Sequence, residues 1–258
     1  MDSNLTLLTL HHSVAIQTYK RPDRLNDTIH LLIDNDIPSL HEIVVVWNDL
    51  EEQPPKDFTA HNGVGVRYRM SRVNSLNEKL WPDPKYRTKA VLLSDDDVHY
   101  HPNDLDFVFQ TWRHQQGRVT GAFGRCVVWK NERWEYSFCD KRDPYALVLT
   151  GLTFVHISLM DYYSSTDPLM ESVRDLVDDR FNCEDIAMNY VASMLTCLGP
   201  LQVSGFDKAV NTAPPKGIST KPGHLEARHE CLNNFTDMFG HMPLINTTEH
   251  VARGLLVG

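Results

Sequence analysis

The sequence predicts an α/β fold built around a largely parallel sheet. Strand and helix patterns alternate over the first two thirds of the 258 residues, as they do in chains of β-α-β units. Residues 42–47 and 89–93 form nearly continuous apolar runs, of the kind that a parallel sheet buries on both faces. Internal repeats and linker-like segments do not occur, so we expect one domain over residues 1–258.

The individual elements follow from local patterns. Residues 13–19 are typical of a strand, and Pro22 then suits the first position of a helix. Leu25, Ile29 and Leu32 recur at helical spacing after it. Residues 184–195 carry one apolar stripe, which predicts a helix with Asn182 as its N-cap. The segment 203–223 is rich in Gly, Pro, Lys and Thr, and predicts a surface loop.

Two polar clusters are expected to face solvent. His11 and His12 are most simply explained as the solvated edge of a strand. Asp175, Asp178 and Asp179 surround two apolar residues and predict the exposed face of a short helix.

Composition and charge exclude several classes of protein. Hydrophobic residues make up 41% and charged residues 23%, which is ordinary globular usage. Acidic residues (34) outnumber Lys plus Arg (25), so the chain lacks the diffuse basic surface that binds nucleic acid. It has no apolar run of about 18 residues, so we expect no membrane span. Signal-peptide features are missing, but sequons at Asn4, Asn26, Asn234 and Asn246 leave open a luminal domain trimmed of its anchor.

Polar residues directly follow three of the expected strands. They are Gln17 and Thr18, then Asn48, then the triplet Asp95, Asp96 and Asp97. Ligands of parallel sheets bind at the carboxyl ends of the strands, so we expect the chemistry there. Three adjacent carboxylates repel one another, and a divalent cation relieves that repulsion. Oxygen donors favour Mn²⁺ or Mg²⁺ with a diphosphate completing the shell, and a solvated acidic turn is the alternative.

Several segments occur in a recognisable order along the chain. They are 16–21, 44–48, 74–77, 90–98, 182–189 (Asn-Cys-Glu-Asp-Ile-Ala-Met-Asn), 231–235 and 239–244. Together they resemble glycosyltransferase family 64, the exostosin and exostosin-like enzymes, over about residues 14–244. The resemblance implies a GT-A fold, with a nucleotide-sugar-binding half at about 10–125 and an acceptor-binding and catalytic half at about 126–250.

The resemblance also implies roles for individual residues. It places Asp97 as the metal ligand and Arg125 at the acceptor, with an ordinary salt bridge as the alternative for Arg125. Family members carry Arg at the position of Lys79, so a two-pronged contact is lost there. The implied donor-binding residues are Gln17, Thr18, Arg21, Asn48, Asn74, Lys79, Asp95, Asp96, Glu184, His224 and Arg228.

Asp185 falls on the catalytic carboxylate of the family. From its position near a helix start, it is equally a capping residue. In the catalytic role it stabilises an oxocarbenium-like transition state or forms a glycosyl-enzyme bond, while a concerted same-face transfer is also compatible with retention. Arg228, four residues after His224, would stabilise the leaving diphosphate, and a surface pair is the alternative.

The five cysteines show no zinc-site spacing. Their number alone allows one or two disulfides, or five thiols in a reducing compartment. The resemblance implies a bond between Cys183 and Cys231 in a Golgi or endoplasmic reticulum lumen. We expect at least one of Cys126, Cys139 and Cys197 to be a free thiol.

The leading functional hypothesis is a metal-dependent retaining glycosyltransferase. It would move a sugar, with N-acetylhexosamine favoured, from a UDP-sugar to a glycan or glycolipid. A GDP-mannose-dependent transferase acting on a sphingolipid head group is the first alternative. A nucleotidyl- or phosphotransferase is disfavoured because the phosphate-binding pattern GxxxxGK[ST] does not occur. A non-catalytic carbohydrate-binding module is disfavoured because the triplet and Asp185 are intact.

Overall fold

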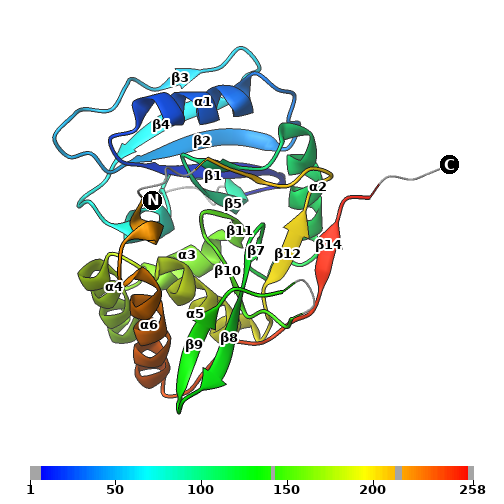
Figure 1. Ribbon diagram of the computed structural model, residues 1–258. Coiled ribbons are helices and arrows are strands. Elements are labelled where there is room, and N and C mark those ends of the chain that lie inside the picture. Colours follow the sequence, from blue (N-terminus) through cyan, green and yellow to red (C-terminus); the bar gives the residue numbers. More distant parts are fainter. Residues whose placement is uncertain (1–6, 141–142, 213–216, 255–258) are drawn as a thin grey trace.

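A central sheet runs through the whole fold (Figure 1). The computed structural model describes residues 7–140, 143–212 and 217–254. Within these ranges the sheet has nine strands in the order β14-β12-β7-β11-β5-β1-β2-β4-β3. The strands β5, β1, β2 and β4 at its centre are parallel to one another, so the predicted α/β fold with a largely parallel sheet is confirmed.

The central strands are β1 (Leu8–Thr18), β2 (Leu40–Trp47), β4 (Gly65–Met70) and β5 (Thr88–Asp95). The predicted strands overlap β1, β2 and β5, and each of these three strands brings its polar segment to the same edge of the sheet. Gln17 pairs in register with Asp95, and Thr18 pairs with Trp47. The carboxyl ends of the three strands therefore lie side by side.

Two helices cover one face of the sheet. They are α1 (Pro22–Ile33), which begins at Pro22 as predicted, and α2 (Pro102–Arg113). Ile29 of α1 and Phe109 of α2 belong to one buried cluster with Val14 and Ile16 of β1. This packing fixes the strand that carries Gln17 and Thr18.

Four helices cover the opposite face and form a second core. They are α3 (Ile157–Tyr163), α4 (Pro168–Arg180), α5 (Glu184–Thr196) and α6 (His224–Phe239). Ala15 of β1, on the other side of the strand from Val14, lies in this cluster with Val177 and Ile186. The predicted helix 184–195 is confirmed and is one residue longer.

The predicted N-cap of α5 is wrong. Cys183 takes the N-cap position with a left-handed φ of 79° and makes no side-chain cap bond. The side-chain oxygen of Asn182 accepts instead from the N–H of Cys183 at 2.8 Å and from Arg228 at 3.1 Å. Asn182 is thus used to hold an arginine rather than to begin a helix.

Shorter elements complete the fold. They are β3 (Phe58–Thr59), η1 (Leu76–Leu80), β6 (Val98–His99), β7 (Thr120–Gly121), β8 (Gly124–Lys130), β9 (Arg133–Ser137), β10 (Leu147–Val148), β11 (Leu152–His156), β12 (Leu201–Ser204), β13 (Val210–Asn211), η2 (Ile218–Thr220) and β14 (His250–Ala252). The loop predicted at 203–223 is partly wrong, because it contains the end of β12 and the strand β13, which pairs with β6. Its residues 213–216 lie outside the described part.

The solvated strand edge expected at His12 is also wrong. The ring of His12 is fully buried, between Phe109 and Phe154, at centroid distances of 4.9 and 5.1 Å. Neither ring nitrogen has a hydrogen-bond partner among the described residues. Burial, and then the charge of His11, lowers the pKa of His12 to about 3.

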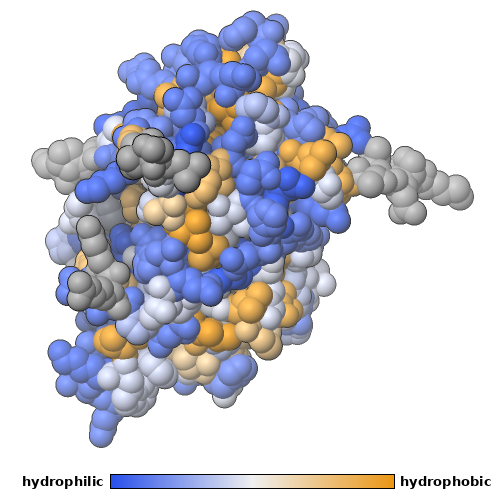
Figure 2. Space-filling view, turned by 90° about the vertical axis from the view of Figure 1, so that its right-hand side faces the viewer, coloured by the Kyte–Doolittle hydropathy of each residue, from blue (hydrophilic) through white to orange (hydrophobic). Residues whose placement is uncertain are grey.

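The surface is mixed in polarity, as expected from the ordinary globular composition. On the face shown in Figure 2, apolar atoms form several separate areas divided by hydrophilic side chains. Among the described residues, no helix is both long and apolar enough to cross a bilayer. Of the sequon residues, Asn26 and Asn246 are exposed and Asn234 is partly buried in α6, while Asn4 lies outside the described residues.

Candidate active site

The nucleotide side of the site is built where β1 and β2 end. The side-chain amides of Gln17 and Asn48 both donate to the carbonyl oxygen of Ser75, at 2.7 and 2.9 Å. Asn48 also donates to the side-chain oxygen of Asn74 at 3.3 Å. Three of the predicted donor-binding residues are therefore held together by the segment that leads into η1.

Arg21 neutralises two members of the aspartate triplet. Its Nη2 lies 2.6 Å from Asp96, and its Nη1 lies 2.6 Å from Asp97. Thr18 donates to the other oxygen of Asp96 at 2.7 Å. Burial raises the pKa of Asp96 to about 6, against the opposing effects of Thr18 and Arg21. The carboxylate of Asp96 is thus buried against β1 and Arg21.

Asp95 points the other way and meets a buried lysine. Lys79 Nζ lies 2.6 Å from Asp95 Oδ1, with the Lys79 side chain 1% exposed and that of Asp95 37% exposed. Burial disfavours the charged lysine, but the charges of Asp95 and Glu184 outweigh it, so the pKa of Lys79 is raised. Lys79 is therefore a fixed positive charge with one carboxylate partner that remains open to solvent.

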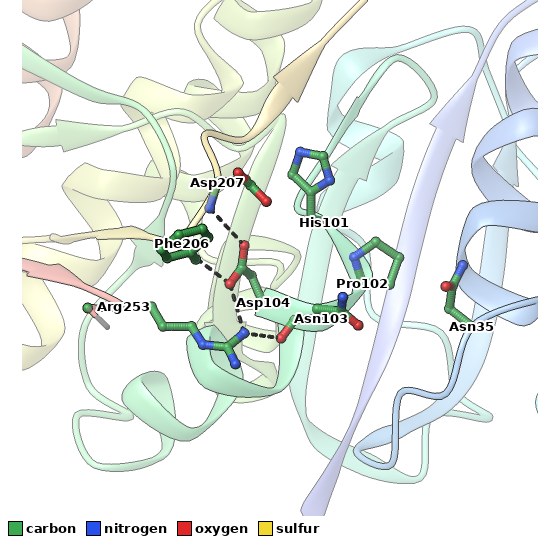
Figure 3. Close-up of a pocket in the computed structure, with 9 residues that line it drawn as sticks. Asn35, His101, Pro102, Asn103, Asp104, Phe206, Asp207 and Arg253 are labelled. Carbon is green, nitrogen blue, oxygen red and sulfur yellow. Dashed lines mark hydrogen bonds and ion pairs between the residues drawn. The ribbon is translucent and has the colours of Figure 1, made fainter. Parts of the chain in front are cut away.

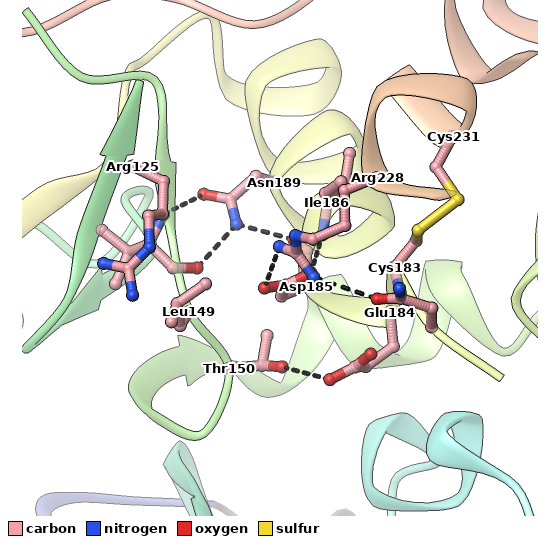
Figure 4. A network of polar contacts seen from close by, with 12 residues as sticks. Arg125, Leu149, Thr150, Cys183, Glu184, Asp185, Ile186, Asn189, Arg228 and Cys231 are labelled. Atoms are coloured by element: carbon pink, nitrogen blue, oxygen red, sulfur yellow. Dashed lines mark hydrogen bonds and ion pairs between the residues drawn. A yellow bond between two sulfur atoms is a disulfide. The ribbon is translucent and has the colours of Figure 1, made fainter. Parts of the chain in front are cut away.

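A buried charge pair joins α5 to α6. Asp185 Oδ2 lies 2.7 Å from Arg228 Nη2, and both residues are buried (Figure 4). The Arg228 guanidinium lies 4.2 Å from the centroid of the Tyr136 ring. Burial disfavours its charge, but Asp185 more than offsets this, so the pKa of Arg228 is raised. The surface pair considered for Arg228 is wrong.

Asp185 also serves the start of its helix. Its Oδ1 accepts from the N–H of Ile186 at 2.7 Å, while its Oδ2 carries the ion pair. Asn189, one turn further on, donates to the backbone oxygen of Asp185 at 2.7 Å and to that of Val148 at 2.9 Å. One oxygen of Asp185 therefore makes a local contact at the start of the helix, and the other makes the tertiary contact with Arg228.

Glu184 interacts electrostatically both with the pair of Lys79 and Asp95 and with the pair of Asp185 and Arg228. Burial, followed by the charges of Asp185 and Asp95, raises its pKa to about 7, while Lys79 and Arg228 act in the opposite direction. Its carboxylate accepts a hydrogen bond from the hydroxyl of Thr150 at 3.4 Å. Residues from β5, η1, α5 and α6 thus form one cluster of interacting charges.

The remaining predicted residues lie around this cluster. His224 begins α6, and its Nδ1 lies 3.2 Å from the side-chain amide of Asn182. Burial, and then the charge of Arg228, lowers the pKa of His224. Arg125 stands to one side of Asn189 in Figure 4. Its guanidinium carbon lies 4.9 Å from the Phe138 ring, and it makes no ion pair within the described residues, so the salt-bridge alternative is not supported.

Two disulfides brace this half of the molecule. Cys183 is bonded to Cys231, which ties the start of α5 to the middle of α6 (Figure 4). A second bond joins Cys126 to Cys139, and Cys197 is free and exposed. The predicted bridge and the predicted free thiol are both confirmed.

Sequence reasoning missed several residues of the site. Tyr136 and Thr150 come from segments with no pattern that points to them. Asn189 lies four residues after Asp185 in a helical segment, so helical spacing is a signal that places it beside Asp185.

The oxygen donors of the aspartate triplet are compatible with a divalent metal, but the protein alone does not supply a complete set of ligands. The triplet supplies hard carboxylate oxygens, which suit Mn²⁺ or Mg²⁺. Within the described residues, however, no three His, Cys, Asp or Glu side chains converge on a metal position. Asp97, the predicted ligand, pairs with Arg21. Most of the coordination shell would have to come from a bound diphosphate and water.

A cavity of about 420 Å³ lies elsewhere, at the start of α2 (Figure 3). It is lined by His101, Asp104, Phe206 and Arg253 among others, and Asp104 pairs with Arg253 at 3.0 Å. None of the predicted site residues lines it. The predicted site residues therefore lie at the charge cluster and apart from this cavity.

Comparison with known proteins identifies the family. The sequence model described as "Glycosyl transferase family 64 domain" matches residues 12–255. Exostosin-2 of Homo sapiens is 31% identical over 250 residues, which cover 95% of this chain and 34% of that protein. The "Glucosamine inositolphosphorylceramide transferase 1" of Arabidopsis thaliana is 31% identical over 223 residues, which cover 80% of this chain and 27% of that protein. The chain thus spans between about a quarter and a third of the length of these curated relatives.

A solved structure, "Crystal structure of GalNAc-T7 with UDP, GalNAc and Mn2+", shares the fold. The TM-score is 0.51 at 15% sequence identity, and the match covers 77% of this chain and 42% of that chain. This likeness to a GT-A glycosyltransferase confirms the predicted fold. With a family match over almost the whole sequence, the chain belongs to glycosyltransferase family 64, the family of the exostosins.

Proposed function

We propose that this chain transfers a sugar from a UDP-sugar to a glycan or glycolipid, with retention of configuration and with the help of a divalent metal. N-acetylhexosamine is the favoured sugar. The name of the Arabidopsis relative contains glucosamine and inositolphosphorylceramide, which supports an amino sugar and a glycolipid acceptor. The solved GT-A neighbour holds UDP, GalNAc and Mn²⁺, which supports a UDP-sugar and a metal.

One observation carries the proposal. The buried pair of Asp185 and Arg228 lies in one charge cluster with Lys79 and Asp95, at the edge where the parallel strands end. Two buried cations beside three carboxylates are costly to a fold, and such arrangements gather at functional sites. The cluster contains the charges that a sugar diphosphate and a developing sugar cation require.

The residues divide the reaction between them. The bond from the anomeric carbon to the diphosphate oxygen breaks with its electron pair on the diphosphate. The oxygen of an acceptor hydroxyl bonds to the anomeric carbon on the same face of the sugar, and the hydroxyl proton passes to the departing diphosphate. The Asp185 carboxylate stabilises positive charge on the sugar ring, or bonds to the anomeric carbon in a two-step reaction. Arg228 and Lys79 stabilise the negative charge of the leaving diphosphate. A divalent cation, held by Asp97 and the diphosphate, would supply Lewis-acid stabilisation to the same group.

The other donor contacts and the acceptor contact follow from position. Gln17, Asn48 and Asn74 line the nucleotide side, and Arg125 lies across Asn189 from Asp185, where an acceptor could meet it. We propose that the described residues act as one catalytic domain, with donor binding at about 10–125 and acceptor binding at about 126–250.

The lumen of the Golgi or endoplasmic reticulum is the proposed compartment. Two disulfides persist in an oxidising environment, and the sequon residues Asn26 and Asn246 are exposed. Both features support this location.

A donor screen tests the proposal. The purified chain is mixed with Mn²⁺ and with UDP-N-acetylglucosamine, UDP-N-acetylgalactosamine or GDP-mannose, and released nucleotide is measured. We expect release from a UDP-N-acetylhexosamine, loss of release with a chelator, and loss in Asp97→Ala but not in Asp36→Ala, which alters an exposed aspartate. Release from GDP-mannose alone would favour the alternative donor. No release from any donor would contradict the transferase assignment, and full activity in chelator would contradict the metal.

The stereochemistry is tested separately. Nuclear magnetic resonance of the product, made with an acceptor that gives turnover, reports the configuration at the new glycosidic bond. The donor configuration should be kept, and an inverted product would refute retention and with it the two-step role proposed for Asp185.

A further inference from the structure

We infer that Asp178, on the last turn of α4, is a positioning residue that holds the nucleotide-binding segment of the site in place. This inference rests on the proposed function, and it assigns a role to a carboxylate that sequence patterning places on a solvated helix face. It concerns the segment of residues 74–79, which we call the η1 segment.

Asp178 makes two hydrogen bonds to the η1 segment. Its Oδ1 accepts from the side-chain amide of Asn77 at 2.8 Å and from the hydroxyl of Ser75. The Ser75 hydroxyl in turn accepts from the backbone N–H of Asn77 at 2.9 Å. One carboxylate oxygen therefore anchors both side chains that begin the 3-10 helix.

The anchored segment holds the nucleotide-side residues. The carbonyl of Ser75 accepts from both Gln17 and Asn48. Four residues after Ser75, Lys79 of η1 pairs with Asp95 at 2.6 Å. A shift of the η1 segment would move the acceptor that Gln17 and Asn48 share, and it would move the buried lysine.

Asn77 is fixed from two further directions. Its amide also donates to the backbone oxygen of Arg174 at 3.0 Å, and its oxygen accepts from the hydroxyl of Tyr163 at 2.5 Å. The contact with Asp178 is therefore one of several that dock η1 on α3 and α4, and its loss should loosen the segment without unfolding the protein.

The last turn of α4, which carries Asp178, leads directly into residues 181–185, the segment that contains Asn182 and Asp185. The N–H of Asn182 donates to the carbonyl of Val177 at 3.3 Å, and Phe181 ends the helix in a left-handed conformation with a φ of 47°. Asn182 then holds Arg228, and Asp185 follows three residues later. Asp178 thus joins the nucleotide side of the site to the turn that positions the catalytic carboxylate.

Neighbouring acidic residues of α4 provide a matched control. Asp175 is exposed, as Asp178 is, and it lies one turn earlier on the same helix. Within the described residues, the Asp175 side chain makes no hydrogen bond or ion pair. A general effect of negative charge on α4 would be the same at both positions, whereas a positioning effect belongs to Asp178 alone.

The test is calorimetric titration of the disulfide-bonded chain with UDP, and in a parallel arm with GDP, each with Mn²⁺. In Asp178→Ala we expect the dissociation constant for the bound nucleotide to rise about fivefold, the factor that corresponds to about 1 kcal/mol for one net hydrogen bond. Asp178→Asn keeps an acceptor oxygen and should restore affinity, and Asp175→Ala should bind as the unaltered chain does. The donor KM should rise with the dissociation constant, kcat should fall by a smaller factor because Lys79 shifts with the segment, and the melting temperature should stay nearly unchanged.

A double variant gives a second measurement. Asn77→Ala removes the other side of this contact together with the bonds to Arg174 and Tyr163, so the loss in the double variant should be smaller than the sum of the two single losses. Unchanged affinity in Asp178→Ala, an equal loss in Asp175→Ala, or additive losses would each overturn the inference while leaving the proposed function intact. Failure of the unaltered chain to bind either nucleotide would instead refute the proposed function, and the inference with it.

Discussion

The buried His12 makes the stability of the fold depend on pH, and replacing it tests the packing of the core. The pKa of His12 is lowered to about 3 by burial, against an ordinary value of 6.5. Between these two values the unfolded chain binds a proton that the folded chain does not. The free energy of unfolding therefore falls as the pH drops through this window, and above pH 6.5 the penalty vanishes.

The size of the effect follows from the two pKa values. One pKa unit corresponds to about 1.4 kcal/mol, so His12 should cost about 3 kcal/mol of stability between pH 7 and pH 4. His12→Leu removes the titrating ring and two ring nitrogens that lack partners among the described residues. The variant should be close to the unaltered chain at pH 7 and more stable by about 3 kcal/mol at pH 4.

Urea denaturation at a series of pH values measures this difference. Val14→Ala is the control, because it alters an uncharged side chain in the same core and on the same strand. It should lower the free energy of unfolding by about 2 kcal/mol at every pH. A difference between His12→Leu and the unaltered chain that does not change with pH would refute the burial of a neutral His12.

Three further predictions concern the site. Asp185→Asn should lower turnover by about a hundredfold and leave donor affinity nearly intact, as kcat and calorimetric dissociation constants will show, because the charge is needed mainly in the transition state. Tyr136→Leu removes the ring beneath the Arg228 guanidinium and should lower kcat about tenfold. Tyr136→Phe keeps the ring and should retain activity, so equal losses in both variants would contradict a role for the ring face. Cys231→Ala opens a 48-residue loop and should lower the denaturation free energy by up to about 4 kcal/mol, whereas the same loss in Cys197→Ala would contradict the assigned pairing.

The edge of the sheet was the most predictable part of the site. Gln17, Asn48 and Asp95 each follow an apolar run, and in a parallel sheet the ends of such runs meet at one edge whatever the rest of the fold does. The register that pairs Gln17 with Asp95 is the direct result. The apolar runs and the parallel topology were sufficient to predict this edge, because both determine where the few residues at the strand ends lie.

Residues that reach the site through packing were not predictable in this way. Tyr136 comes from the hairpin of β8 and β9, and Asp178 comes from the exposed side of α4. Neither contact has a periodic signal, because each depends on how a helix docks against a distant segment. Sequence patterning therefore places Asp178 correctly on an exposed face and misses its partner.

His12 and Asn182 were misjudged for local reasons that the structure makes plain. The register of β1 with β2 shifts between His12 and Ser13, and both residues are buried, so alternation along the strand does not report exposure. Asn182 precedes a helix, as a capping residue does, but Cys183 enters the left-handed region before the first turn. The side chain that would cap the helix is thereby left to hold Arg228.

Under the proposed function, the buried pair of Asp185 and Arg228 serves the reaction rather than the stability of the fold. Removing both charges from water costs several kcal/mol each, which their attraction barely repays, so apolar residues would serve a core as well. The structure nevertheless surrounds the pair with supports: Tyr136 beneath the guanidinium, Asn182 beside it, and a disulfide between the two helices that carry the charges. Supports of this kind fix the orientation of charges before a substrate arrives, which is the condition under which they stabilise a transition state without reorganising. We propose that an aromatic ring, an amide and a disulfide hold this one ion pair because the pair takes part in the proposed transfer reaction.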